Sequence, residues 1–449
     1  MDPTTRPTTP PHIPIFGVAV KSTYVSEVIT AAFPNHTLES ITELPFGQSW
    51  NNRLYFLSVA PPSATAASAS PPEPLKWVLK VNGRFFGHEK VQNEVSCLKL
   101  VEKYCKEVSA PRVVAWSLDG ASITVPTSRE TVTDGERTAK ISSDGNSKQQ
   151  PPWIIMTQLP GDRAASFSLD NRAMASVGSQ LADIVASLRT NIPKARQCGN
   201  ILFGPGRAAA EDAELLNKQR ISTDEESSID GLRIRGLLGD GIQLGDRESI
   251  SSALELHATR LRDKLRLLQT EDVHRPNREL VPLITHFLTE TLPTLDGEEV
   301  AKPGEEAESP FTFTHYDLSL GNTLIEAPDP SREDSLPRVT GIIDFEFSGF
   351  FPPPEEFVND DVGNADDWPP AVRDAYLSRL EALGIRTPRK GIDARIWRRE
   401  LLMGKLLDNI APWWLPGGHA GEVLASKLAE CAAVVRSTIR ELGELGQEL

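Results

Sequence analysis

The chain is short of cysteine, and its basic residues are outnumbered by acidic ones. Lys and Arg total 47 against 62 Asp and Glu in 449 residues, which gives a formal net charge of −15. Nucleic acids are bound largely through Lys and Arg contacts to phosphates, so this balance argues against a nucleic-acid partner. The cysteines form no Cys-x-x-Cys pair and no metal-ligand spacing, which predicts a reducing compartment; they are Cys97, Cys105, Cys198 and Cys431.

Long apolar runs and a secretory leader are also absent from the sequence. No stretch approaches the roughly 18 apolar residues that a membrane helix needs. The first residues, MDPTTRPTTPPHIP, lack the basic-then-apolar pattern of a signal peptide. We therefore expect a cytoplasmic protein with no membrane partner. A chain of this length can bury the cores of two lobes.

What the sequence does contain is a set of polar residues in two short motifs. THYDLSLGNTLI begins at residue 314 and TGIIDFEFSG at residue 340, and together they carry His315, Asp317, Asn322 and Asp344. An Asp followed five positions later by Asn, and then by an apolar strand that ends in Asp, is typical of kinases. Phosphoryl transfer depends on positioning and charge neutralisation more than on covalent chemistry, and these residue types suit it.

Short strands are expected to bring these residues together. Alternating phenylalanines and threonines predict a strand before His315. Residues 323–325 predict a second strand, and Val339–Ile343 a third that delivers Asp344 beside Asn322. A side-chain amide oxygen and a carboxylate are both ligands that magnesium takes alongside phosphate oxygens.

Each of these polar residues then has an expected role. Asp317 would accept the proton of a substrate hydroxyl, and His315 would orient the loop. Asn322 and Asp344 would bind magnesium, and Glu346 would reach a second magnesium. The alternative is chance, because Asp and Asn both favour loops; the combination with the apolar strand is what makes the pattern specific.

A lysine on a strand and a glutamate on a helix are candidates for the phosphate side of the site. Alternating side chains from Leu75 to Lys80 predict a strand. The apolar spacing after Val91 predicts a helix that carries Glu94. In kinases such a Lys contacts the phosphates and pairs with such a Glu. The alternative is a surface lysine and a solvated glutamate, the usual fate of both residue types.

Two further segments are candidates for nucleotide binding. The loop LPFGQSWNNRLYFL, which begins at residue 44, offers a tight turn and polar donors at Gly47, Ser49, Asn51 and Asn52. It lacks Gly-x-Gly-x-x-Gly, and its composition fits any hairpin. The run from Trp153 to Met156, followed by Leu-Pro-Gly, predicts an edge strand and a hinge. The backbone near Met156 and Gln158 would bind adenine there.

Together these motifs resemble the aminoglycoside phosphotransferase family, within the protein-kinase-like fold that also contains choline kinases. The resemblance implies an α+β, two-lobed fold. An N-terminal lobe of antiparallel sheet with one helix would bind ATP over residues 1–157, and a mostly helical C-terminal lobe would span 158–449. Loop or disordered inserts are expected near residues 61–74 and 127–152, and an insert near 198–250 is either disordered or a lid.

The expected function is that of an ATP- and magnesium-dependent phosphotransferase acting on a hydroxyl of a small molecule, such as an amino sugar or amino alcohol. The acidic balance suits a cationic acceptor, although solvated inserts would explain it equally well. Glu346 replaces the glycine of the protein-kinase Asp-Phe-Gly motif, and no Ala-Pro-Glu is present, which argues against a protein acceptor. Tyr316 stands where the resemblance leads one to expect glycine. The alternative function is a pseudokinase that binds nucleotide or a partner.

The acceptor pocket is the least determined part of the sequence. Helical stripes after residue 180 predict a core of packed helices. The acceptor would lie over Asp317, near a loop that contains Glu355, Glu356, Asp360, Asp361, Asp366 and Asp367. Trp413 and Trp414 would stack against a cationic ring. Exposed acids that keep a loop soluble and tryptophans that pack in a core are the ordinary alternatives.

Overall fold

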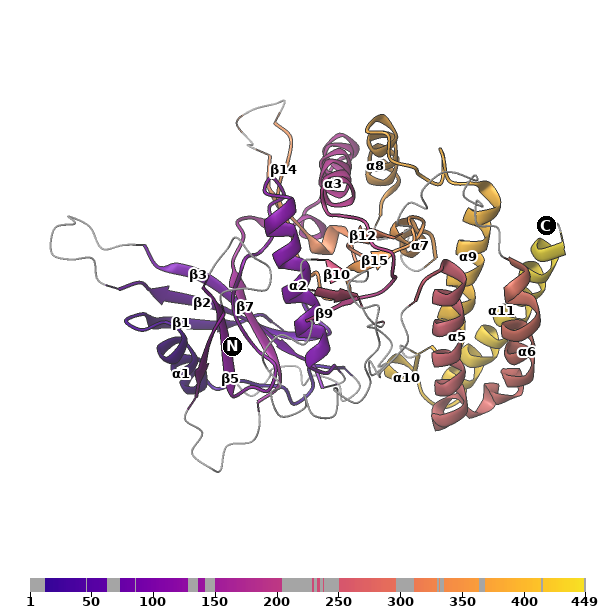
Figure 1. Ribbon diagram of the computed structural model, residues 1–449, viewed down its shortest axis with the longest axis horizontal. Helices are drawn as coiled ribbons and strands as arrows, with labels where there is room; N and C mark the ends of the chain where they lie inside the picture. Colours follow the sequence, from indigo (N-terminus) through magenta and orange to yellow (C-terminus); the bar gives the residue numbers. More distant parts are fainter. Residues whose placement is uncertain are drawn as a thin grey trace. The chain divides into compact units, whose positions relative to one another are not determined.

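The computed structural model forms two compact units, each built from separate stretches of chain (Figure 1). Unit 1 contains Met1–Pro160, Ile201–Arg233 and Thr340–Phe347; unit 2 contains Gly161–Asn200, Ile234–Val339 and Ser348–Leu449. The structure describes residues 13–45, 47–62, 73–84, 86–127, 136–141, 150–203, 228–229, 232–234, 237, 250–295, 311–328, 331, 335–362, 368–412 and 415–447.

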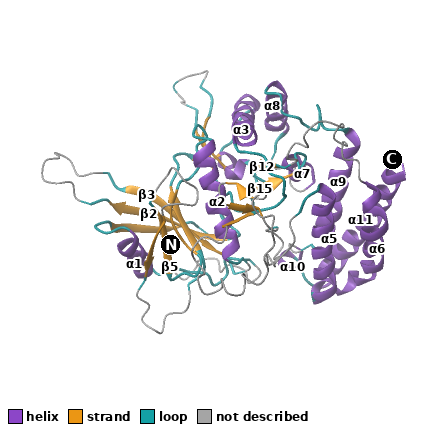
Figure 2. Cartoon of the chain, in the orientation of Figure 1, coloured by secondary structure: helices purple, strands orange, loops and turns teal. Residues whose placement is uncertain are grey.

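Unit 1 is built on a large antiparallel sheet, whose strands are drawn in orange in Figure 2. The sheet has seven strands in the order β1-β2-β3-β7-β4-β5-β6. Its strands are β1 (Thr37–Glu43), β2 (Asn52–Ala60), β3 (Leu75–Asn82), β4 (Val113–Ser117), β5 (Ser122–Pro126), β6 (Glu136–Lys140) and β7 (Trp153–Thr157). A small second sheet has the order β10-β11-β9 and contains β9 (Ile201–Phe203), β10 (Ser228–Ile229) and β11 (Leu232–Ile234).

Two helices cover opposite faces of the large sheet. Successive side chains of a strand point to opposite faces. Leu79 on β3 therefore packs with the apolar side of α1 (Ser22–Ala32), whereas its neighbour Lys80 bonds to Glu94 of α2 (His88–Tyr104). The face of the sheet under α1 is therefore apolar, and the face under α2 carries charged residues.

The described part of unit 2 is mostly helical. Helix α3 (Asn171–Asn191) packs closely on α8 (Pro370–Ala382). A second group shares one apolar core of leucines, isoleucines and Phe287, and contains α5 (Ala253–Thr270), the 3-10 helix η4 (Asp272–Leu280), α6 (Val281–His286), the π-helical turn η5 (Phe287–Thr291), the 3-10 turn η6 (Leu292–Leu295), α9 (Ala394–Asn409) and α11 (Gly421–Gln447).

Short strands and turns complete unit 2 around the Asp317 loop. Strand β12 pairs with β15 before that loop, and β13 pairs with β8 after it. The boundary between the two units falls inside β14. The bounds are β8 (Asp162–Arg163), the 3-10 turn η2 (Ala164–Ser166), β12 (Thr312–Thr314), the 3-10 turn η7 (Leu320–Asn322), β13 (Thr323–Glu326), β14 (Arg338–Ile342), β15 (Gly349–Phe351), α7 (Glu355–Val362) and α10 (Leu415–Gly418).

The α+β architecture agrees with the prediction, and three local expectations are wrong. Strand β7 is not at an edge, because it pairs with β3 on one side and β4 on the other. Residues 136–140, expected within a loop, pair with β5 as strand β6. The acids at 355 and 356, expected in a loop, begin helix α7, where carboxylates at a helix N-terminus are favoured.

The units also divide the chain differently from the continuous domains 1–157 and 158–449. The first break lies after Pro160, but Ile201–Arg233 and Thr340–Phe347 group with unit 1. Most of the inserts near 61–74, 127–152 and 198–250 lies outside the described residues.

Candidate active site

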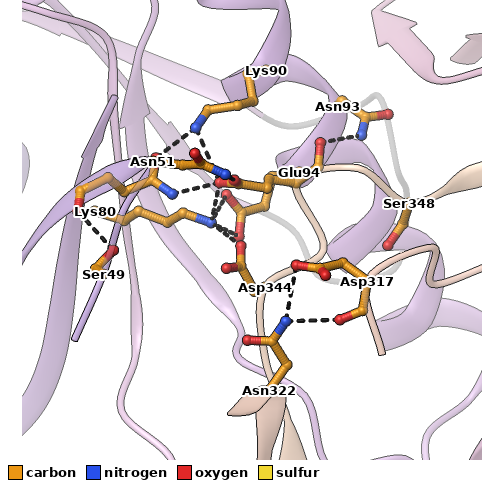
Figure 3. A network of polar contacts seen from close by, with 12 residues as sticks. Ser49, Asn51, Lys80, Lys90, Asn93, Glu94, Asp317, Asn322, Asp344 and Ser348 are labelled. Carbon is orange, nitrogen blue, oxygen red and sulfur yellow. Dashed lines mark hydrogen bonds and ion pairs between the residues drawn. The ribbon is translucent and has the colours of Figure 1, made fainter. Parts of the chain in front are cut away.

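Unit 1 holds a buried cluster of three carboxylates around Lys80 (Figure 3). The ammonium nitrogen of Lys80 lies 2.8 Å from Glu94, 2.5 Å from Asp344 and 2.8 Å from Glu346. Burial lowers the pKa of Lys80, but the three carboxylates outweigh burial and raise it well above its ordinary value. The predicted Lys80–Glu94 pair is therefore formed, with Lys80 held as a cation.

The three carboxylates differ in how far they reach solvent. The side chains of Glu94 and Glu346 are 3% and 1% exposed, whereas that of Asp344 is 29% exposed. Burial, followed by repulsion from Glu346, raises the pKa of Asp344. A divalent cation at the open carboxylate would offset that repulsion, so the donor set fits magnesium at Asp344.

Glu346 is the most heavily bonded of these acids. Asn52 and Asn51 donate side-chain N–H groups to its oxygens at 2.5 and 3.1 Å, and Lys90 contacts it at 3.1 Å. Burial alone would raise the pKa of Glu346, but Lys80 and Lys90 hold it well below its ordinary value. Glu346 thus links the β1–β2 loop, α2 and the segment after β14. Its role as a ligand of a second magnesium stays a prediction.

The β1–β2 loop has the turn that its sequence predicted. Gly47 lies in the left-handed region at φ +90°, which favours glycine because it has no Cβ. The Ser49 hydroxyl donates to the Asn52 carbonyl at 2.8 Å. The Asn52 amide oxygen accepts from Lys90 at 2.7 Å, so Asn52 belongs to the Glu346 cluster. Nucleotide binding by Gly47, Ser49 and Asn52 stays a prediction.

The expected adenine hinge follows β7. Met156 is buried inside the sheet between Val78 and Val113. The backbone N–H of Gln158 already donates to the Lys76 carbonyl at 3.0 Å. Adenine binding by Met156 and Gln158 remains a prediction.

In unit 2, Asn322 holds Asp317 in place. The Asn322 amide donates to the Asp317 carbonyl at 2.7 Å and to its carboxylate at 3.0 Å (Figure 3). Asp317 itself is exposed. With the Asn322 nitrogen used in this way, its oxygen is the atom left to bind a cation. The structure places Asn322 in unit 2 and Asp344 in unit 1, so their joint binding of one magnesium stays a prediction.

His315 is buried behind the loop. It is 1% exposed, and its carbonyl accepts a hydrogen bond from the Ser348 hydroxyl at 2.9 Å. Tyr316 follows it in the left-handed region at φ +71°, an uncommon conformation for a residue with a Cβ. Burial of His315 agrees with an orienting role and leaves Asp317 as the exposed acid of the loop.

Sequence reasoning missed Lys90 and Arg260. Lys90 is 1% exposed and lies one helical turn before Glu94. That i, i+4 spacing was the available signal, since such pairs share a helix face. Arg260 of α5 contacts Tyr316 and Glu355, and no local pattern marked it. Glu355 and Glu356 are buried, and Trp413 and Trp414 lie outside the described residues, as do Asp366 and Asp367.

A comparison with protein families matches this chain to the phosphotransferase enzyme family, designated APH, over residues 44–391. The matched stretch is more than half of the chain and includes the β1–β2 loop, the Lys80 cluster and the Asp317 loop. The chain belongs to this family. The expectation of a phosphotransferase is confirmed. No curated protein sequence matches the phosphotransferase significantly.

Among solved structures, the phosphotransferase is similar to several antibiotic phosphotransferases. The streptomycin–ATP ternary complex of APH(2″)-IIa has a TM-score of 0.47 and 11% identity, covering 93% of this chain and 99% of that one. ADP-bound APH(2″)-Ib has a TM-score of 0.47 and 10% identity, and the match covers 94% of this chain and 99% of that one. Macrolide 2′-phosphotransferase MphH from Brachybacterium faecium has a TM-score of 0.43 and 14% identity, and the match covers 92% of this chain and 97% of that one. The family assignment rests on the match to the family model. Similarity of fold at such low identity does not indicate the substrate of this chain.

Among the described helices of the phosphotransferase, none is both long and apolar enough to cross a membrane.

Proposed function

We propose that this phosphotransferase transfers the γ-phosphoryl group of ATP to a hydroxyl of a small molecule. The observation that carries the proposal is the pairing of Lys80 with Glu94 and Asp344, together with an exposed Asp317 fixed by Asn322. The first group supplies a fixed cation for phosphate oxygens, and the second supplies a positioned carboxylate for the hydroxyl proton.

The residues divide the work between binding and proton transfer. Lys80, aimed by Glu94, would contact the phosphates. Asp344 and the Asn322 amide oxygen would hold magnesium, which neutralises charge on the phosphates when bound. Asp317 would accept the hydroxyl proton, and its hydrogen bond from Asn322 keeps the carboxylate in one orientation before the substrate arrives.

The acceptor that we propose is an amino sugar or amino alcohol. The net charge of −15 would attract a cationic acceptor over distances comparable to the Debye length. Turnover of ATP should be measured against a panel of amino sugars, choline-like alcohols and neutral sugars. Phosphorylation of only neutral sugars would contradict the proposed acceptor class but leave the reaction type intact.

The general base is tested by Asp317→Asn. This change keeps the shape of the side chain but removes its ability to accept a proton, so kcat should fall by about 10²–10⁴. The midpoint of thermal unfolding should not change, because Asp317 is exposed. Asp374→Asn, on the exposed surface of α8, is the control and should retain full activity. Wild-type kcat in Asp317→Asn would rule out this base, and a wild-type protein that binds ATP without any turnover would favour the pseudokinase alternative.

A further inference from the structure

Tyr316, directly before Asp317, is held by charged residues that the proposed function does not use. Its φ of +71° places it where glycine is normally preferred. Because Tyr316 and Asp317 are consecutive, a change in the backbone of Tyr316 would redirect the Asp317 side chain. What keeps Tyr316 in this conformation therefore bears on the proposed base.

Arg260 of α5 supplies that restraint. One guanidinium nitrogen donates to the Tyr316 hydroxyl at 2.5 Å, and another donates to Glu355 of α7 at 2.9 Å. The guanidinium carbon lies 5.6 Å from the centre of the Tyr316 ring. Phe351 lies against the same ring, with the centroids 4.7 Å apart. The tyrosine is thus fixed at both its hydroxyl and its ring.

Arg260 is itself held rigidly. The side chains of Arg260 and Glu355 are 16% and 4% exposed, so solvent screens the pair only weakly. One turn earlier on α5, His257 bonds to Glu400 of α9 at 2.9 Å. The Arg260–Glu355 pair therefore connects α5 to α7, and the His257–Glu400 bond connects α5 to α9 within one helical turn of it. These contacts leave Arg260 little freedom to move away from Tyr316.

A metal ion is a competing explanation for this cluster. His257, Glu355 and Glu400 offer ligand atoms within 4.8 Å of one another. Both acids already have cationic partners: Glu355 has Arg260, and Glu400 has Arg399, which bonds to it through two nitrogens at 3.0 and 2.8 Å. With each carboxylate already neutralised, a divalent cation would have to displace a buried arginine.

We propose that Arg260 is a positioning residue that acts through Tyr316 to hold Asp317 in its reactive orientation. This inference rests on the proposed function, in which Asp317 is the base. It also gives a reason for tyrosine at a position where the family resemblance leads one to expect glycine. A glycine adopts this φ freely, whereas a tyrosine can be fixed there from the side by α5.

The test compares Arg260→Met, Tyr316→Phe and their double variant in steady-state transfer to the best acceptor of the panel, with ATP hydrolysis as the readout if no acceptor reacts. Arg260→Met should lower kcat by about 10–100-fold, since misplacing a catalytic group by about 1 Å costs this order. KM for ATP should stay within about 2-fold. Tyr316→Phe, which loses only the hydroxyl and leaves the Arg260–Glu355 pair, should lower kcat by about 3–10-fold. The kcat of the double variant should be no lower than that of Arg260→Met, because both changes break the same hydrogen bond between Arg260 and Tyr316.

Two controls separate positioning from general destabilisation and from failure of the proposed function. Arg436→Met breaks an exposed pair with Glu279 in the same unit and should leave kcat unchanged. Asp317→Asn is assayed in parallel. If Asp317→Asn is inactive while Arg260→Met and Tyr316→Phe keep wild-type kcat, the inference is wrong and the proposed function stands. If Asp317→Asn is fully active, the proposed base fails, and the inference falls with it.

A crystal structure of Arg260→Met provides a readout that does not depend on activity. It should show Tyr316 outside the left-handed region or its ring turned away from Phe351. An unchanged Tyr316 would overturn the inference.

Discussion

Lys80 is surrounded by more negative charge than one ammonium group neutralises. Glu94, Asp344 and Glu346 all contact it, and Lys90 supplies the second cation of the cluster. Burial and the neighbouring acids raise the pKa of Glu94 to about 7, although Lys80 opposes this. The cluster therefore holds three acids against two ammonium groups, and the magnesium ion proposed above would offset this excess of negative charge.

Lys80→Met is expected to impair both folding and nucleotide binding. Removing one partner leaves buried carboxylates without compensation, which costs about 3–5 kcal/mol in the free energy of unfolding. Lys76→Met on the same strand is the matched control, because Lys76 is exposed and donates to the neutral Ser58 hydroxyl rather than to a buried carboxylate. Urea titration of both variants measures the difference. Equal stability of the two would show that the Lys80 cluster contributes nothing to the fold.

The packing of α3 on α8 depends on a glycine. A Cβ added at Gly178 would clash with the backbone oxygen of Val372, an atom that cannot rotate away. Gly178→Ala should therefore lower the free energy of unfolding by about 1–3 kcal/mol, because overpacking forces the helices apart. Thermal and urea unfolding would measure it.

Gly443 on α11 is the matched control for this helix pair. A Cβ there meets nothing within 4 Å. Gly443→Ala should raise the free energy of unfolding by about 0.5–1 kcal/mol through helix propensity alone. If both alanines stabilised the protein, close contact between α3 and α8 would not limit its stability.

Elements with clear periodicity could be predicted from the sequence, and elements defined by distant partners could not. The apolar spacing of α2 and the alternation in β3 predicted the positions of these two elements, and the helical stripes after residue 180 predicted the packed helices of unit 2. β7 was misplaced at an edge because strand order depends on which strand pairs with β3, and alternation does not encode that choice. Helix α1 was missed although Val25, Val28, Ile29 and Ala32 form an apolar stripe.

The candidate site shows the same division. Asp317, Asn322 and the Lys80–Glu94 pair follow motifs or local spacing. The structure forms the expected Lys80–Glu94 pair, whereas the hydrogen bond from Asn322 to Asp317 was not predicted. Lys90 and Glu346 are 256 positions apart in sequence, and Arg260 and Tyr316 are 56 apart. Contacts over such separations arise from the fold. The i, i+4 spacing of Lys90 and Glu94 indicates a shared helix face, but it does not indicate Glu346 as a partner.

Binding of nucleotide and metal should be measurable as a change in global stability. A ligand that binds only the folded state raises its stability by RT ln(1 + [L]/Kd), which is about 2.7 kcal/mol at 100 times Kd. We expect ATP with magnesium to raise the thermal midpoint of the wild type, and EDTA to remove most of this gain. In Asp344→Ala the magnesium-dependent part should disappear. Asp272→Ala, at a 97% exposed side chain, is the control; an identical magnesium effect in Asp344→Ala would exclude Asp344 as a ligand.

Unit 1 is formed by stretches that lie far apart in the sequence, and this has a consequence for synthesis of the protein. Lys80 and Lys90 leave the ribosome long before Asp344 and Glu346, yet these four side chains form one cluster. Until residue 347 has emerged, the nascent sheet carries two lysines whose acidic partners, apart from Glu94, have not yet been translated. The first 160 residues therefore cannot complete their own charged face, and a fragment ending at Pro160 would expose it to chaperones and proteases.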